Sequence, residues 1–362
     1  MKESPKRGAG SPAKRPSSLV SEPGPPRGIA SGVRRLERAQ ARSSNSRRTP
    51  HPSSFARARV LVVGDAMLDR YWFGEVERIS PEAPVPIVKI DHEEERAGGA
   101  ANVARNAAAL GAQVTLLSVV GADEPGARLE ALLKREHIHP QLHHDRNIKT
   151  TVKLRVIAGR KQQLLRVDFE TSPSHEVLAS KLRDFTRILG DMDVVILSDY
   201  GKGGLTHIVK MIGLARRAGK KVLVDPKGED YSRYSGATLI TPNRAEFRQV
   251  AGGWNGEREL TERAQRLRHK LGVQALLVTR GEEGMTLFED GTRFHVRTQA
   301  REISDVSGAG DTVIAALAVA LASGARMKEA VRLANRAAGI VVGKFGTAVV
   351  TPVELFGRHG DE

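Results

Sequence analysis

A short run of small residues before an apolar segment carries the most reactive arrangement in the chain. Gly308, Ala309 and Gly310 precede Asp311, and residues 313–322 are almost entirely aliphatic. The spacing predicts a buried helix whose first backbone N–H groups point at an anion, since those groups have no partner in the first turn and the helix dipole favours negative charge there. The three amides would form an anion hole for a transferring phosphoryl group, and Asp311 would accept a proton from the attacking hydroxyl as general base. The alternative is a segment that only caps its own helix.

Two earlier segments carry groups suited to a polyhydroxylated ligand. Gly98 and Gly99 permit close backbone approach, and Asn102 offers both a donor and an acceptor. Asp65 and Asp69 follow the first predicted strand, at the end where open α/β sheets bind ligands. We therefore predict that these residues bind sugar hydroxyls. Tight helix packing by the glycines and a turn cap by one of the carboxylates are the alternatives.

Polar groups also follow several later strands. Lys202 would meet a phosphate as a point charge. Asn243 and Glu246 lie about one helical turn apart and face the same way, and such oxygen ligands suit hydrated Mg²⁺ beside ATP phosphates, with Glu246 binding through water. The alternative is that Glu246 only complements the dipole of its own helix. Four further residues would border a nucleotide, unless they form a surface turn or a plain helix face: Thr279, Gly281, Gly284 and Asn335.

From residue 58 onward, short Val-, Ile- and Leu-rich runs alternate with longer segments of helical period. The runs predict strands buried on both faces, and the alternation predicts right-handed βαβ units. The expected fold is therefore α/β, a doubly wound and mostly parallel sheet flanked by helices. The expected strands are 60–63, 114–120, 194–197, 222–224, 238–240 and 275–278, and the expected helices are 101–110, 126–136, 205–218, 244–250 and 260–271.

Three segments break this rhythm and predict a small accessory β-sheet. Residues 85–90, 151–157 and 162–168 read as exposed antiparallel strands, the last two joined by a turn at Gly159-Arg160. Lys153 and Arg155 alternate with apolar residues, so basic and apolar side chains lie on opposite faces. We expect a lid, with strands within about 71–90 and 151–169, that covers a site or pairs with a second subunit.

The net charge of +15 belongs mainly to the N-terminal segment. Residues 1–59 contain 14 Lys and Arg against three Glu, a net charge of +11, which leaves +4 for the other 303 residues. Residues 1–57 are rich in Pro, Ser and Arg and lack an apolar period, so we predict a disordered basic tail. A solvated extension or a start placed too far upstream, a nucleic-acid-binding tail and a targeting segment stay open. Residues 358–362 are predicted to be a C-terminal tail.

Composition also excludes some classes of protein. The chain has no cysteine, so disulfides and thiolate metal sites are excluded, and its 11 histidines form no HExxH pattern, which argues against a catalytic zinc site. The longest apolar stretch is far shorter than the roughly 20 residues of a membrane span. We therefore expect a soluble, cytoplasmic protein that does not bind membranes.

Taken together and in this order, the motifs resemble the ribokinase-like (PfkB) carbohydrate kinases over about residues 58–357. The marks of that family are the early Gly-Gly segment and the late GAGD segment. Within it, GDAMLDRYWFGEVERISPEAPVPIV (64–88), AGGAANVARN (97–106), SDYGKG, VDPKG and TPNRAEF resemble the kinases of D-glycero-β-D-manno-heptose 7-phosphate. KLRV (153–156) and QQLLRVDFE (162–170) add to the same resemblance.

The resemblance implies transfer of the ATP γ-phosphoryl group to the anomeric hydroxyl of heptose 7-phosphate, giving the 1,7-bisphosphate used for ADP-heptose and lipopolysaccharide. It implies ATP and Mg²⁺ as cofactors, with a monovalent cation left open. The exposed lid strands, for their part, suggest a homodimer formed through the lid. The resemblance also implies roles for Asp311 as base and for Asp65, Gly98, Gly99 and Asn102 in holding the sugar. A phosphorylated acceptor would account for Arg155 and Lys202 as substrate ligands.

Two other functions stay open from the sequence alone. One is a ribokinase or fructokinase that acts on an unphosphorylated sugar. The other is a non-catalytic sugar or nucleotide sensor that binds nucleic acid through the basic tail. The chain shows no HxGH motif, so we expect a kinase without an appended adenylyltransferase domain.

Overall fold

The structure, a computed structural model, describes residues 52–159, 162–300, 304–344 and 346–357. The expected tails therefore lie outside the described residues, apart from residues 52–57 at the end of the N-terminal tail. Of the expected turn at Gly159-Arg160, only Gly159 is described. Residues 52–55 form a short helix, α2 (Pro52–Phe55), in which Phe55 is buried with its ring centroid 5.5 Å from that of Phe356. This contact places the last residues of the expected tail within the packed unit.

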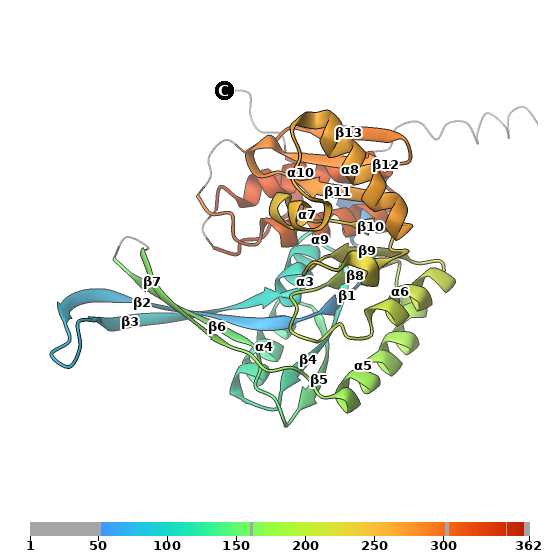
Figure 1. Ribbon diagram of the computed structural model, residues 1–362. Coiled ribbons are helices and arrows are strands. Elements are labelled where there is room, and N and C mark those ends of the chain that lie inside the picture. The colour runs from blue at the N-terminus through green and yellow to red at the C-terminus, as the bar shows by residue number, and fades with distance from the viewer. Residues whose placement is uncertain (1–51, 160–161, 301–303, 345, 358–362) are drawn as a thin grey trace, which may run out of the picture. The chain divides into compact units, whose positions relative to one another are not determined.

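A nine-stranded sheet forms the centre of this unit (Figure 1). Its strand order is β13-β12-β11-β10-β9-β8-β1-β4-β5, with parallel pairing from β11 to β5 and antiparallel pairing of β12 and β13. The strands are β1 (Arg59–Gly64), β4 (Gln113–Gly121), β5 (His139–Asp145), β8 (Val194–Ser198), β9 (Lys221–Asp225), β10 (Leu239–Ile240), β11 (Ala275–Thr279), β12 (Met285–Glu289) and β13 (Thr292–Val296).

Helices cover both faces of this sheet, as the continuous apolar runs require. Val60 and Val62 of β1 belong to a hydrophobic cluster with α3, α4, α9 and α10, whereas Leu61 and Val63 belong to a cluster with α5, α6, α7 and α8. Alternate side chains of one strand therefore pack on opposite layers. The helices are α3 (Ala100–Ala109), α4 (Glu124–Arg135), α5 (His175–Ile188), α6 (Ile208–Arg217), α7 (Arg244–Ala251), α8 (Gly256–Leu271), α9 (Ala309–Ala322), α10 (Met327–Val341) and α11 (Pro352–Phe356). Three short 3₁₀ turns complete the described elements: η1 (Leu189–Asp191), η2 (Tyr231–Tyr234) and η3 (Gly281–Glu283).

The accessory sheet has four strands in the order β3-β2-β6-β7. They are β2 (Ala66–Ile79), β3 (Pro86–Gly99), β6 (Val152–Ala158) and β7 (Gln162–Phe169). The antiparallel pairs are β2 with β3 and β6 with β7, but β2 and β6 run parallel, so the expectation of a purely antiparallel sheet was wrong. Parallel pairing requires a long crossover connection, and the segment from β3 to β5 provides it between β2 and β6. Figure 1 shows β2 and β3 as a long ribbon extending from the sheet that bears β1.

Helix α9 is apolar all round and lies in the interior. Every residue from Asp311 to Leu321 is buried, and the helix packs on α3, α10 and the strands β1, β8 and β9. A helix without a polar face is stable only when surrounded by protein. Its first turn is therefore a rigid platform for the polar group that it carries.

None of the described helices is long and apolar enough to cross a membrane.

Candidate active site

Asp311 lies in the first turn of α9 with 7% of its surface exposed. Its Oδ1 accepts a hydrogen bond of 2.6 Å from the Tyr200 hydroxyl, and its Oδ2 accepts one of 2.6 Å from Asn102 Nδ2. Burial raises the pKa of Asp311 to about 6, although these two hydrogen bonds act in the opposite direction. A carboxyl group in this range is ionised near neutral pH and still basic enough to accept a proton.

Gly308 is the N-cap of α9 and has a left-handed backbone, with φ of 77°. A Cβ at this position would lie 2.8 Å from Asn102 Nδ2. Both constraints select glycine, because other residues rarely adopt this conformation and an added methyl group would push against the amide that contacts Asp311. Gly308 therefore leaves room for the hydrogen bond between Asn102 and Asp311.

Two hydrogen bonds join α3 to α9. One is the Asn102–Asp311 bond, and the other runs from Thr312 Oγ1 to Asn106 Oδ1 at 2.7 Å. Asn106 also donates to the Asn102 carbonyl at 2.9 Å. The structure thus places Asn102, predicted to hold the sugar, directly against the predicted base.

Asp65 is surrounded by backbone amides of the loop that follows β8. Its Oδ2 accepts from the N–H groups of Tyr200 and Lys202, both at 3.0 Å, and its Oδ1 accepts from Gly204 at 2.9 Å. Lys181 Nζ donates to the Gly204 carbonyl at 2.8 Å from the other side, and burial lowers the pKa of Lys181 to about 8. In this structure Asp65 therefore holds the loop that follows β8 through three backbone amides.

Asp69 lies on β2, where it meets the basic side of the lid. Arg155 Nη1 donates to Asp69 Oδ1 at 2.7 Å, and the guanidinium of Arg155 lies 5.1 Å from the centre of the Tyr71 ring. A Cβ on Gly98 would collide with Asp69 Oδ2, and one on Gly99, whose φ is 56°, would collide with the Asp65 carbonyl. The two glycines therefore allow β2 and β3 to approach closely at this point.

Two lysines approach the same region. Lys202 Nζ forms a 2.5 Å ion pair with Glu170 Oε1, and Lys153 Nζ lies 5.8 Å from the centre of the Tyr200 ring. Burial lowers the pKa of Lys153, and Asp69 counteracts part of this effect. This region therefore contains three cations, Lys153, Arg155 and Lys202, of which Arg155 pairs with Asp69 and Lys202 pairs with Glu170.

Asn243 and Glu246 form a capping box at the start of α7. Asn243 Oδ1 accepts from the amides of Ala245 and Glu246, and Glu246 Oε2 accepts from the Asn243 amide at 3.0 Å. The other oxygen of Glu246 lies 3.3 Å from Lys227 Nζ. Asn243 and Glu246 thus cap their own helix in this structure, and Glu246 Oε1 remains paired with Lys227.

Asp225, at the end of β9, belongs to the VDPKG segment but received no role from the sequence. Burial raises the pKa of Asp225 well above its ordinary value, and the charges of Asp311 and Glu246 raise it further. The described residues contain no group of three or more His, Cys, Asp or Glu side chains placed to hold a metal ion. A hydrated Mg²⁺ bound chiefly by phosphates fits such a place, because a cation would offset the repulsion among these carboxylates.

A cavity of about 380 Å³ joins the residues predicted to border a nucleotide. Thr279, Gly281, Gly284 and Asn335 all line it, and Ala309 and Gly310 of the predicted anion hole lie on its wall. Its remaining wall is largely apolar, with contributions from Met285, Val306, Val313, Ala338 and Val342. An apolar cavity that ends on a helix N-terminus suits a base and its attached phosphates.

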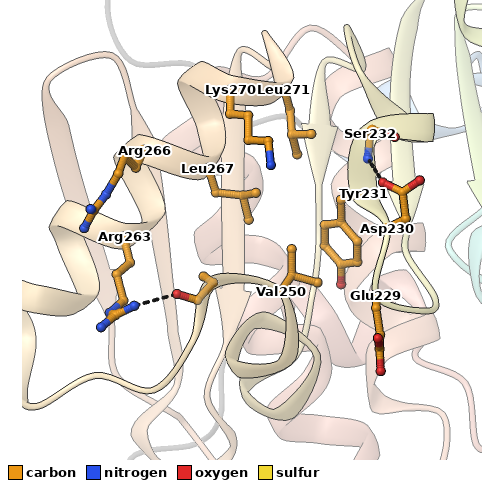
Figure 2. Close-up of a pocket in the computed structure, with 11 residues that line it drawn as sticks. Glu229, Asp230, Tyr231, Ser232, Val250, Arg263, Arg266, Leu267, Lys270 and Leu271 are labelled. Atoms are coloured by element: carbon orange, nitrogen blue, oxygen red, sulfur yellow. Dashed lines mark hydrogen bonds between the residues drawn. The ribbon is translucent and has the colours of Figure 1, made fainter.

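A second cavity of about 340 Å³ lies between η2, the end of α7, and α8 (Figure 2). Tyr231, Val250 and Leu267 form part of its wall, with Arg266 and Lys270 on α8. None of its lining residues belongs to the motifs described above. The hydroxyl of Tyr231 has no hydrogen-bond partner among the described residues.

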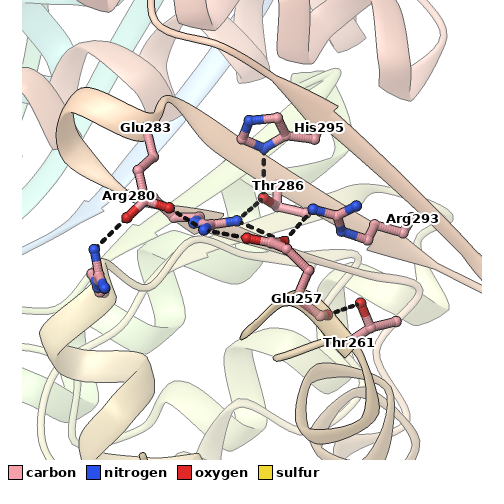
Figure 3. Close-up of polar contacts among 8 residues, drawn as sticks. Glu257, Thr261, Arg280, Glu283, Thr286, Arg293 and His295 are labelled. Carbon is pink, nitrogen blue, oxygen red and sulfur yellow. Dashed lines mark hydrogen bonds and ion pairs between the residues drawn. The ribbon is translucent and has the colours of Figure 1, made fainter. Parts of the chain in front are cut away.

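A network of ion pairs supports the loop at the nucleotide cavity (Figure 3). Arg280, which is 7% exposed, donates to both carboxylate oxygens of Glu257, at 2.6 and 3.0 Å, and pairs with Glu283 of the loop. Glu257 also pairs with Arg293, and Glu283 also pairs with Arg244. Arg280 therefore ties the turn that lines the cavity to the start of α8.

Tyr200, Lys153 and Asp225 lie in segments named from the sequence, but none of them received a role in the site there. Tyr200 and Lys153 contact or face Asp311 from segments more than 100 residues away, which no local pattern can reveal. Asp225 follows a predicted strand, and this position was the signal available for finding it.

Comparison with known proteins identifies a family and two similar proteins. Residues 57–354 match the model of the pfkB family of carbohydrate kinases. The chain is 59% identical over 303 residues to D-beta-D-heptose 7-phosphate kinase of Bordetella bronchiseptica, covering 84% of this chain and 96% of that protein. It is 54% identical over 310 residues to the bifunctional protein HldE of Nitrosococcus oceani, of which it spans 64%.

Solved structures of more distant proteins share the fold. Arabidopsis thaliana ribokinase, complexed with ribose and ATP, aligns with a TM-score of 0.67 and 22% identity, covering 83% of this chain and 97% of that chain. Escherichia coli phosphofructokinase-2, in complex with potassium, aligns with a TM-score of 0.68 and 20% identity, covering 83% and 96%. The prediction of a ribokinase-like, doubly wound sheet with a smaller second sheet is confirmed.

Proposed function

Because the chain belongs to the pfkB family of carbohydrate kinases, we propose that it phosphorylates D-glycero-β-D-manno-heptose 7-phosphate at the anomeric hydroxyl, with ATP as donor. The product is the 1,7-bisphosphate, an intermediate on the route to ADP-heptose and lipopolysaccharide. The similarity to the Bordetella kinase over nearly its full length supports this substrate. The observation that carries the chemistry is the buried carboxylate of Asp311, which lies between the nucleotide cavity and the cations of the lid.

In the proposed reaction, Asp311 accepts the proton of the anomeric hydroxyl as its oxygen forms a bond to the γ-phosphorus. The bond between that phosphorus and the β,γ-bridging oxygen breaks, ADP leaves, and the proton on Asp311 is later released to water. The amides of Gly308, Ala309 and Gly310 stabilise the charge on the transferring group, and that of Ala309 must first leave the Val306 carbonyl, to which it donates at 3.2 Å. Asp69 orients sugar hydroxyls, with Asp65, Gly98 and Gly99 shaping the backbone around them.

The nucleotide is assigned to the 380 Å³ cavity. Thr279, Gly281, Gly284 and Asn335 border it there, with Asn243 at the phosphate end. Mg²⁺ would be held through its waters by Glu246 and Asp225, and when bound it neutralises charge on the phosphates. A cytoplasmic location is part of the same proposal, because the reaction consumes ATP.

The acceptor's own phosphate is assigned to cations of the lid strand β6 and of the loop that follows β8. Lys153, Arg155 and Lys202 gather near Asp69, which is more positive charge than a neutral sugar needs. Asp69 pairs with Arg155, and Glu170 pairs with Lys202. Lys153 has no ion-pair partner among the described residues, so three cations face two carboxylate partners here. The phosphate thus accounts for the charge of this surface.

Phosphorus NMR with heptose 7-phosphate and ATP tests the substrate directly. We expect a new anomeric phosphate signal that grows in step with ADP, while the 7-phosphate signal is retained. Ribose and fructose serve as acceptors in parallel reactions. Turnover of either sugar without turnover of heptose 7-phosphate would refute the assignment.

We also propose a homodimer formed through the lid. Six of the nine large apolar side chains that are exposed in the described residues belong to lid strands or their connections: Val76, Ile79, Val85, Ile90, Leu165 and Phe169. Such a cluster is typical of a surface that is covered in an assembly. Light scattering of Ile79→Glu should report a monomer, whereas Val209→Glu, at an exposed apolar residue outside the lid, should keep the wild-type mass. A monomeric wild-type protein would contradict the proposal.

A further inference from the structure

Tyr200 contacts the proposed base, although no motif assigns it a role. Its hydroxyl donates to Asp311 Oδ1 at 2.6 Å, while Asn102 donates to Oδ2 at the same distance. A carboxylate oxygen can accept more than one hydrogen bond, so each oxygen keeps capacity for the acceptor's proton. The two donors fix the plane of the carboxylate without using up its basicity.

The position of Tyr200 is determined by its backbone. Asp65 accepts its N–H at 3.0 Å, together with the N–H groups of Lys202 and Gly204. Lys181 holds the Gly204 carbonyl at 2.8 Å. A loop anchored at both ends by buried charges holds the phenol in place before substrate arrives.

The charges around Asp311 come from several elements. Asp69 on β2 and Asp225 on β9 add negative charge, whereas Lys153 on β6 adds positive charge. Burial, followed by the charge of Asp311, raises the pKa of Tyr200 well above its ordinary value, so its hydroxyl stays protonated and remains a donor over the working pH range. With two carboxylates nearby and little solvent, the hydrogen bond from Tyr200 favours the ionised form of Asp311.

We propose that Tyr200 is a positioning residue for phosphoryl transfer, whose hydroxyl orients the Asp311 carboxylate toward the acceptor hydroxyl and keeps it ionised. This inference rests on the proposed function, since it requires Asp311 to be the base. Tyr200 acts through Asp311 and needs no contact with the substrate. Its loss should therefore change the pH dependence of the reaction more than the binding of ATP.

The test is the pH profile of kcat for Tyr200→Phe. Loss of a hydrogen bond to a charged group corresponds to a shift of about 1–2 pH units in the titration of that group. We expect the acid limb of the profile to move up by about that amount, so that the rate near pH 6 falls about 5- to 50-fold. KM for ATP should stay close to the wild-type value. An acid limb that superimposes on the wild-type limb would overturn the proposal.

Tyr231→Phe is the matched control. Tyr231 is also buried, but its hydroxyl has no partner among the described residues and it lines the separate cavity in Figure 2. Its pH profile should match the wild type. A shift in this control equal to that of Tyr200→Phe would show that loss of any buried phenol has the same effect, and would overturn the specific role.

Ring-fluorinated tyrosine at position 200 gives a second measurement if Tyr200→Phe folds poorly. Fluorination makes the phenol a stronger hydrogen-bond donor with nearly the same shape, so the acid limb should move to lower pH, opposite to the phenylalanine variant. An unmoved limb would refute the role of the hydroxyl. Asp311→Asn separates the two proposals: a normal rate in that variant refutes the base itself, whereas an inactive variant together with unmoved Tyr200 profiles refutes only Tyr200.

Discussion

Replacing Asp311 by Asn should remove activity and at the same time change how stability depends on pH. A general base contributes roughly 10²- to 10⁴-fold to the rate, so we expect kcat to fall by at least about 100-fold. ATP binding should be nearly unchanged, since the nucleotide cavity is lined by other residues. Coupled ADP release measures the first effect, and calorimetric titration with ATP measures the second.

The effect on stability follows from burial of the carboxyl group. Its pKa in the folded protein is about 6, against an ordinary value of 3.8. The group therefore contributes its full stabilisation only below about pH 3.8, and this is lost as the pH rises through 6. From these two values, the wild type should lose about 2 kcal/mol relative to the variant between pH 4.5 and pH 7.5.

Urea unfolding of both proteins at the two pH values measures this difference. Titrating groups distant from Asp311 are shared by the two proteins and cancel when the variant is compared with the wild type at each pH. Asp225 does not cancel, because the charge of Asp311 raises its pKa, so the difference reports Asp311 together with this neighbour. A difference in unfolding free energy that does not change with pH would refute the raised pKa of Asp311. Near-normal turnover in the variant would refute its role as base, whatever the stability result.

Two further substitutions test the parts that support the site. Gly308→Ala should lower the unfolding free energy by about 1–2 kcal/mol and also reduce kcat, because φ is 77° and the added methyl would crowd the base. Gly310→Ala, where a Cβ meets nothing within 4 Å, should leave urea stability almost unchanged, and equal losses in both variants would contradict this reasoning. Arg280→Met should raise KM for ATP several-fold with a smaller effect on kcat, because it frees the loop at the cavity. Arg258→Met, on the exposed face of α8, is the control, and an unchanged KM in Arg280→Met would show that the loop is held by other contacts.

The inner strands could be predicted closely because strands buried on both faces consist of consecutive apolar residues. Residues 60–63, 194–197 and 275–278 are apolar on both faces, and the structure extends each of these strands by only one or two residues. The lid was predicted too short, with residues 85–90 in place of β3 at Pro86–Gly99. The missing part runs through charged residues on both faces, where neither alternation nor apolarity marks a strand. Helix α5 and the strands β5, β12 and β13 were not among the expected elements.

The sequence predicted which strand ends carry the polar groups of the candidate site, but not which groups contact one another. Strand ends carry the polar groups of open α/β sheets, so their common location follows from topology. The hydrogen-bond partners of each group do not follow from topology. Asp65 is occupied by three amides of a distant loop, and Asn102 turns toward Asp311, because pairings of that kind depend on tertiary packing.

The hydrogen bonds between α3 and α9 link segments more than 200 positions apart in the sequence. Asp311 and Thr312 emerge from the ribosome long after Asn102 and Asn106, so a nascent chain can build the first strands and α3 well before it can orient a base. Until α9 arrives, the faces of β1, β8 and β9 that it covers lack their apolar partner. Chains that stop short of residue 322 should therefore be inactive and prone to aggregate, which makes completion of synthesis a checkpoint on activity.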